Sequence, residues 1–65
     1  MNVKYREGQT INYKSGNLCA SGEVISVNQE MVMGKMENVY LVSEGNGARN
    51  MTYVPESQIL TLLNG

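Results

Sequence analysis

Short stretches of alternating apolar and polar residues, separated by turn-forming residues, run along most of the chain. In residues 9–13, Ile11 and Tyr13 recur with a period of two, so they share one face of a predicted strand. Residues 14–17 have the composition of a loop, and a second strand is predicted at residues 23–27, directly after a glycine. Helical periodicity is poor throughout, and the pattern therefore predicts an all-β fold.

The dipeptide Asn46-Gly47 is the strongest hairpin signal in the chain, because both residues tolerate the positive φ angles of a type I′ turn. A turn at this point predicts the cross-strand pairs Glu44–Arg49, Ser43–Asn50, Val42–Met51, Leu41–Thr52 and Tyr40–Tyr53. Since side chains alternate along a strand, this pairing places Tyr40 and Tyr53 on the same face as Val42 and its partner.

A second turn is predicted at Gly34-Lys35, where a glycine in the first central position suits type II′. The pairs predicted from it are Met33–Met36, Met31–Asn38, Gln29–Tyr40 and Val27–Val42. This pairing again collects Tyr40 and Val42 on one face, now with Val27 and Ile25. Two turns considered independently thus select the same buried face. A bulge in this hairpin would shift its outer part by one residue and reverse the side chains beyond it.

The end of the chain breaks the strand pattern at Pro55, which cannot donate a hydrogen bond to a sheet. Residues 55–57, Pro-Glu-Ser, are typical of the start of a single helical turn. The apolar residues in 59–63 then predict a last short strand. We expect a small five-stranded barrel that forms a single domain over residues 1–65.

Four short patterns carry a resemblance to SH3-like barrels over roughly residues 5–63: Gly8-x-x-Ile11, Gly22-x-Val24, Tyr40-x-Val42 and Val54-Pro55-Glu56-x-x-Ile59. Small proteins of bacteriophages and mobile elements look similar, including the Val-Pro-Glu-x-x-Ile ending. The resemblance implies an SH3-like β-barrel with one helical turn before the last strand. It also implies an accessory protein of phage or mobile-element type.

Residues 8–16 and 22–25 are also similar to the first two strands of the type II dihydrofolate reductases. That family binds its ligands in a pore between subunits. It relies on a lysine in the first strand and on a Gln-Ile-Tyr run before the proline. Tyr13 stands at the lysine position here, and the run before the proline is Thr52-Tyr53-Val54. The resemblance implies the barrel, and leaves an oligomeric reductase with Thr52 and Tyr53 in its pore as one alternative function.

The composition excludes most catalytic and metal chemistry. The chain has 65 residues, no histidine, no aspartate and one cysteine. Ser-His-Asp and Cys-His centres, internal disulfides and Cys-only metal sites are therefore impossible. We expect no enzymatic activity and no cofactor. Nucleic-acid binding is a further alternative, although the formal charge is −1; it requires the convergence of Lys4, Arg6, Lys14 and Arg49.

Methionines concentrate around the second predicted turn, where Met31, Val32, Met33 and Met36 lie beside Lys35. Methionine is flexible and polarisable, and it suits surfaces that adapt to a partner. We expect these five residues to form a protein-binding or self-association patch. The alternative is that they fold back and close the end of the barrel, because a small barrel needs every apolar residue for its core.

Tyr5 and Tyr13 are the tyrosines expected on an exposed, partner-binding surface, whereas Tyr40 and Tyr53 are expected in the core. Cys19 stands between Leu18 and Ala20 and is expected to be a small buried apolar residue.

The sequence as a whole indicates a non-enzymatic binding module that binds and blocks a host protein. An anti-defence inhibitor, such as an anti-CRISPR protein, is one form that this function can take. The charged N-terminal residues and the lack of an apolar stretch near ~20 residues favour a cytoplasmic protein that does not contact the membrane. A homo-oligomer and a monomer are equally open, because a chain of this size without a disulfide or a metal is marginally stable alone and gains from self-association.

Overall fold

The computed structural model describes residues 3–44 and 50–65, which form five antiparallel strands and one 3₁₀ turn. The elements are β1 (Thr10–Ser15), β2 (Leu18–Val32), β3 (Lys35–Ser43), β4 (Met51–Pro55), η1 (Glu56–Gln58) and β5 (Ile59–Asn64). Their order in the sheet is β4-β3-β2-β1-β5. No α-helix occurs in these two described stretches. The predicted fold class is confirmed, including the single helical turn before the last strand.

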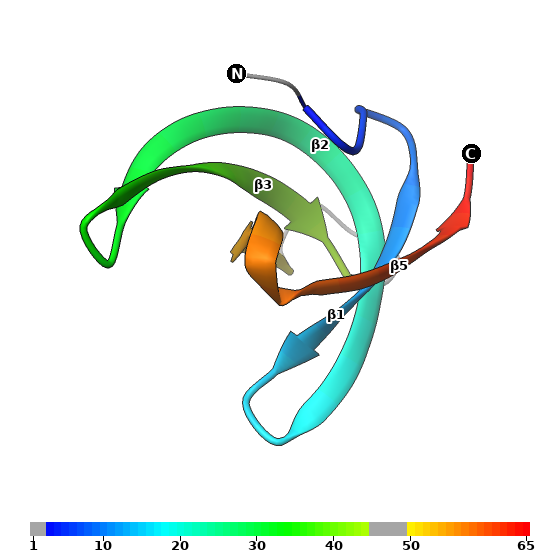
Figure 1. Ribbon diagram of the computed structural model, residues 1–65. Coiled ribbons are helices and arrows are strands. Elements are labelled where there is room, and N and C mark those ends of the chain that lie inside the picture. Colours follow the sequence, from blue (N-terminus) through cyan, green and yellow to red (C-terminus); the bar gives the residue numbers. More distant parts are fainter. Residues whose placement is uncertain (1–2, 45–49) are drawn as a thin grey trace.

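The sheet curls into a small barrel because β2 is long and strongly bent (Figure 1). The first part of β2 pairs with β1 and the remainder pairs with β3, so one strand belongs to both halves of the barrel. Gly22 lies on this strand where the two halves meet. A Cβ at Gly22 would lie 2.5 Å from Val42 Cγ1 and 2.7 Å from the Ser43 carbonyl oxygen, so only glycine fits this close approach.

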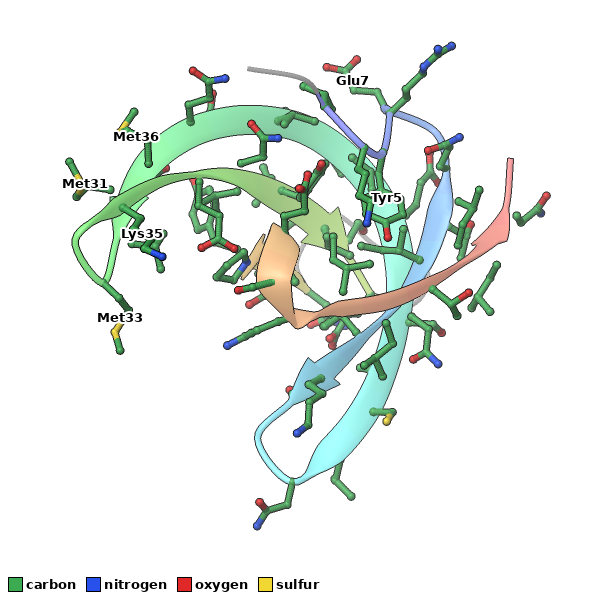
Figure 2. All side chains as sticks on the ribbon, in the orientation of Figure 1. Tyr5, Glu7, Met31, Met33, Lys35 and Met36 are labelled. Carbon is green, nitrogen blue, oxygen red and sulfur yellow. The ribbon has the colours of Figure 1, made fainter. Side chains whose placement is uncertain are left out.

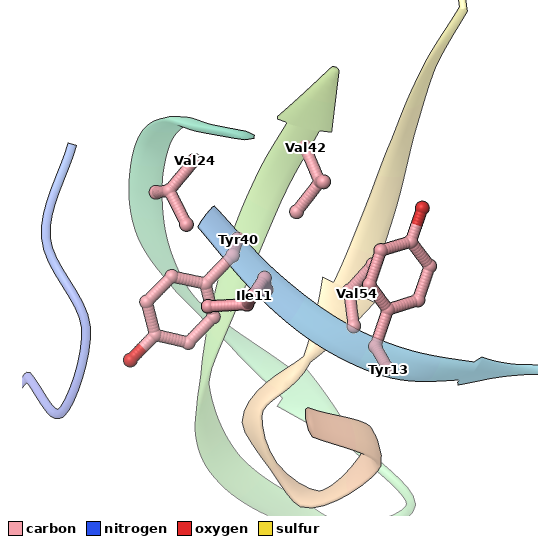
Figure 3. Packing of buried hydrophobic residues seen from close by; sticks show 6 residues of the cluster. All are labelled: Ile11, Tyr13, Val24, Tyr40, Val42 and Val54. Atoms are coloured by element: carbon pink, nitrogen blue, oxygen red, sulfur yellow. The ribbon is translucent and has the colours of Figure 1, made fainter. Parts of the chain in front are cut away.

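The core is a compact cluster of six buried side chains drawn from all strands except β5 (Figure 3). They are Ile11, Tyr13, Val24, Tyr40, Val42 and Val54. Tyr40 and Val42 have no exposed surface, which confirms the prediction that their face of β3 is buried. Val27 and Ile59 are partly buried and pack against this cluster.

The predicted register of β3 and β4 is wrong by one residue. Tyr40 pairs with Val54 and Val42 pairs with Thr52, so Val54 rather than Tyr53 points into the core. Tyr53 is 63% exposed, contrary to expectation. The Glu44 N–H donates to the Asn50 carbonyl oxygen at 2.8 Å, which continues the observed register beyond Ser43 and Met51. The predicted turn at Asn46-Gly47 and the predicted partner Arg49 lie outside the described residues.

The turn between β2 and β3 also differs by one residue from the prediction. Val32 pairs with Lys35, so the central residues are Met33 and Gly34, with φ angles of 52° and 85°. Two positive φ angles are typical of type I′ rather than type II′. A register shift between Val24 and Ser26 then brings Val24 opposite Val42. Ile25 lies at this bulge and is 38% exposed instead of joining the buried face.

The first hairpin is tighter than predicted, because β2 begins at Leu18 and only two residues separate it from β1. Gly16 occupies the first turn position with a φ of 65°. Cys19 is an exposed free cysteine, so the expectation of a buried residue is wrong. It lies opposite Lys14, and both side chains are exposed.

Candidate protein-binding site

The hairpin that joins β2 and β3 carries the predicted partner-binding residues at its end. We call Met31, Val32, Met33, Lys35 and Met36 the methionine tip. Met33 is 97% exposed, Met31 65% and Met36 50%, so the methionines do not fold back over the core. Figure 2 shows the tip projecting well away from the closed part of the barrel. Of the two predicted roles for these methionines, the closing of the barrel end is therefore wrong.

The pairing of β2 with β3 places the side chains of the methionine tip on two opposite faces of the hairpin. Met31 pairs directly with Met36, so their side chains lie together on one face of the ribbon. Val32 pairs with Lys35 on the other face, and Met33 occupies the very end of the turn. Three thioether side chains thus cover one face and the end of the tip, with a single positive charge behind them.

The backbone of Met33 adopts a left-handed conformation that side-chain-bearing residues rarely occupy. Its φ of 52° is the only positive value of a non-glycine residue within residues 3–44 and 50–65. For an L-residue other than asparagine or aspartate, this conformation costs about 1 kcal/mol. Because the Met33 side chain is almost wholly in water, no packing inside the chain offsets this cost.

A polar cluster fixes the base of the projecting hairpin to the end of β4. Asn38 is 3% exposed; its Nδ2 donates to Glu56 Oε1 at 3.1 Å, and its Oδ1 accepts from Gln29 Nε2 at 3.5 Å. The Tyr40 hydroxyl donates to the same Glu56 oxygen at 2.5 Å. These bonds join both strands of the hairpin to η1. The tip therefore extends from a base that is held by hydrogen bonds to the buried Asn38 and the partly buried Glu56.

The pKa shifts of Tyr40 and Glu56 favour the protonation states in which their hydrogen bond forms. Burial raises the pKa of Tyr40 to about 12, with a further contribution from its hydrogen bond to Glu56. Burial alone would raise the pKa of Glu56, but hydrogen bonds from Tyr40 and Asn38 and the nearby Lys4 outweigh it and lower that pKa. A charged Glu56 beside a neutral Tyr40 is thus the state favoured near neutral pH.

The two tyrosines predicted to share the binding surface do not lie at the tip. Tyr5 is half-buried; its N–H donates to the Tyr40 hydroxyl at 3.3 Å, and the two rings meet edge to face at 5.6 Å. Tyr13 is 1% exposed and its hydroxyl donates to Glu44, so the expectation of an exposed Tyr13 is wrong. Burial and this bond hold the pKa of Tyr13 well above its ordinary value. Tyr13 and Ile11 are two residues apart on β1, so both side chains point to the same face, which is the core.

The basic residues required for the nucleic-acid alternative are dispersed. Lys4 and Arg6 belong to the segment before β1, whereas Lys14 lies near the end of β1. Figure 1 shows this segment and the β1–β2 turn at opposite ends of the barrel. Arg49 lies outside the described residues. The structure therefore does not bring Lys14 to Lys4 and Arg6.

The sequence predicted the methionine tip but missed the polar cluster that supports it. Glu56 was expected only to begin a helical turn, and Asn38 was placed opposite a methionine. The one available sign was Glu56 directly after Pro55, at the corner where the chain leaves β4. Within the described stretches there is no pocket and no group of three metal-ligating side chains. Nor does any helix there have the length and apolarity to cross a membrane.

Comparison with known proteins finds no matching family, no matching curated protein and no matching solved structure.

Proposed function

We propose that this chain is a non-enzymatic binding module that inserts the methionine tip into an apolar depression of a partner protein. The observation that carries the proposal is Met33, a 97% exposed apolar side chain on a left-handed backbone. Such a residue destabilises the free chain, and apolar contacts made by its side chain in a complex would offset that cost.

The chemistry of the methionine tip indicates the kind of surface it fits. Unbranched thioether side chains adapt to irregular apolar hollows and pack well against aromatic rings. Lys35 behind them favours an acidic group at the rim of the hollow. The hydrogen bonds at Asn38 and Glu56 hold the base of the hairpin, which lowers the ordering cost of binding.

More specifically, we propose that the chain is a phage or mobile-element accessory protein that binds and blocks a host protein. An anti-defence inhibitor is one example of such a protein. It rests on the sequence resemblance described above. A cytoplasmic setting is favoured by the exposed free thiol of Cys19, which suits a reducing compartment. No specific observation favours nucleic-acid binding or the reductase.

The test compares proteins retained from cell extract by three immobilised forms of the chain: wild type, Met33→Glu and Leu18→Glu. Leu18 is 75% exposed and lies in the other hairpin, so it is a matched control for a new surface charge. We expect a protein that wild type and Leu18→Glu retain and Met33→Glu loses. Circular dichroism should show that Met33→Glu keeps the fold. Equal retention by all three forms, or unfolding of Met33→Glu, would contradict the proposal.

A further inference from the structure

The segment that precedes β1 lies against the barrel through one aromatic side chain. We call residues 3–6 the strap. Tyr5 is half-buried and packs against the core cluster, whereas the other residues of the strap are exposed. The rings of Tyr5 and Tyr40 meet edge to face, with their centroids 5.6 Å apart. The strap leads into a turn that is fastened to β2, where the Gly8 N–H donates to the Val24 carbonyl oxygen at 2.9 Å.

The hydroxyl of Tyr40 connects the strap to the base of the projecting hairpin. It accepts a hydrogen bond from the Tyr5 N–H at 3.3 Å and donates one to Glu56 Oε1 at 2.5 Å. Figure 3 shows this hydroxyl at the margin of the core cluster. The same Glu56 oxygen accepts from Asn38 Nδ2 at 3.1 Å. Hydrogen bonds in a series polarise one another, so the bond from Tyr5 strengthens the bonds that follow it.

Lys4 supplies a second contribution from the strap. Burial alone would raise the pKa of Glu56; after the hydrogen bonds from Tyr40 and Asn38, the backbone and the positive charge of Lys4 help to lower it. A charged carboxylate is a stronger hydrogen-bond acceptor than a neutral one. The strap therefore favours the state of Glu56 in which it holds Asn38 most firmly.

The outer part of the β2–β3 hairpin, residues 29–38, is the part of the molecule that needs this support. We call it the arm. In the described structure β1 pairs with β2 only as far as Glu23, and β4 pairs with β3 only from Val39 onward, so the two strands of the arm pair with each other alone. A two-stranded hairpin is marginally stable by itself. Glu30 also lies directly opposite Glu37, and like charges in such a pair destabilise it.

η1 holds the arm at two points, and the strap acts on one of them. The Ser57 N–H donates to Glu37 Oε2 at 2.7 Å, and Glu56 accepts from Asn38. The second of these bonds belongs to the series that begins at Tyr5. Figure 2 shows Tyr5 far from the methionine tip, so an effect of the strap on the tip passes through the polar cluster rather than through direct contact.

We propose that the strap positions Glu56 and thereby holds the arm in place, so that release of the strap loosens the methionine tip. Tyr5 is a positioning residue in this device, because it acts on the arm through Tyr40 and Glu56. The effect is reciprocal: whatever fixes the arm also holds the strap more firmly. The device operates in the free chain, and the inference does not rest on the proposed function.

Amide hydrogen exchange of the full chain, followed residue by residue by NMR, tests the inference. We expect Tyr5→Ala to speed exchange in the arm about threefold to tenfold, the factor that corresponds to the loss of about one hydrogen bond, while amides in β1 change less. Glu56→Gln should speed exchange in the arm in the same way. Tyr53→Ala makes the same chemical change at a tyrosine of β4 that is 63% exposed, and it should leave the arm as in the wild type.

The double variant separates positioning from a general loss of stability. Added to Glu56→Gln, Tyr5→Ala should speed exchange in the arm little further, because its effect passes through that carboxylate. Tyr5→Leu keeps an apolar side chain over the core and can be used if Tyr5→Ala does not fold.

Arm amides that exchange at the wild-type rate in the Tyr5 variants would overturn the inference. So would an equal acceleration in the arm and in β1, or an acceleration that persists undiminished in the Glu56→Gln background. These rates are measured without a partner, so they do not bear on the retention experiment.

Discussion

Met33 is the residue at which local stability and the proposed role conflict most directly. Type I′ turns favour asparagine before glycine, because asparagine tolerates a positive φ. Met33 precedes Gly34 in that turn and makes no compensating contact, being almost fully exposed. The chain thus has a more stable alternative at this position that would lack the apolar side chain.

Met33→Asn should therefore raise the free energy of unfolding by about 1 kcal/mol, since it relieves the left-handed strain. Urea denaturation measures the change. Met31→Asn is the matched control: it makes the same chemical change at a residue with an ordinary strand conformation, and it should give no gain. A Met33→Asn variant that is no more stable than the wild type would show that the turn is not strained.

At the same scale, the sequence left two roles open for the methionines and did not predict the exposure of Tyr53 and Cys19. Tyr53 and Val54 are neighbours, so an error of one residue in register exchanges which of them is buried. The bulkier tyrosine was placed in the core, whereas the observed pairing of Tyr40 with Val54 buries the valine. Cys19 lies in an apolar run whose outer face no other element covers.

Among the elements, β2 determines the architecture because it serves both halves of the sheet. Its curvature carries it from β1 to β3, and at Gly22 it lies nearly against Val42 and Ser43 of β3. The sequence predicted this strand only from residue 23 onward. It predicted no strand over residues 18–22, since the glycine and serine there lower strand propensity; pairing with β1 overrides that preference.

Gly22→Ala should destabilise the fold by about 1–3 kcal/mol, because the added methyl group meets Val42 Cγ1 and a backbone carbonyl that cannot move freely. Thermal unfolding followed by circular dichroism gives the measurement. Ser21→Ala, at the exposed neighbouring position, should change stability little. An unchanged midpoint for Gly22→Ala would mean that β2 and β3 can separate at this point without cost.

For the molecule as a whole, Glu56 couples stability to pH. Its carboxylate joins η1 to β3, and its pKa in the folded chain is lowered. A lowered pKa means that the folded state binds the proton less readily than the unfolded state. The stabilisation is therefore present above the ordinary carboxyl pKa and is lost as the pH falls through the lower, folded value.

Glu56→Gln should consequently lower the free energy of unfolding by about 1–2 kcal/mol at pH 7, where it replaces a charged hydrogen-bond acceptor with a neutral one. The difference from the wild type should shrink as the pH falls below about 4.5, the ordinary value for this group. Denaturant titrations at a series of pH values measure it. Glu23→Gln, at an exposed glutamate that lies opposite Thr10 and Ser43, is the control. A difference that stays constant with pH would remove Glu56 from this role.

The continuity of β2 also has a mechanical consequence. One uninterrupted backbone segment runs from Leu18 to Val32, is anchored in the core at Val24, and ends beside Met33. The free end of the hairpin thus projects from the barrel, and the backbone hydrogen bonds between β2 and β3 stiffen it. A force applied at Met33 should therefore be carried along the paired strands to the hydrogen bond between Asn38 and Glu56.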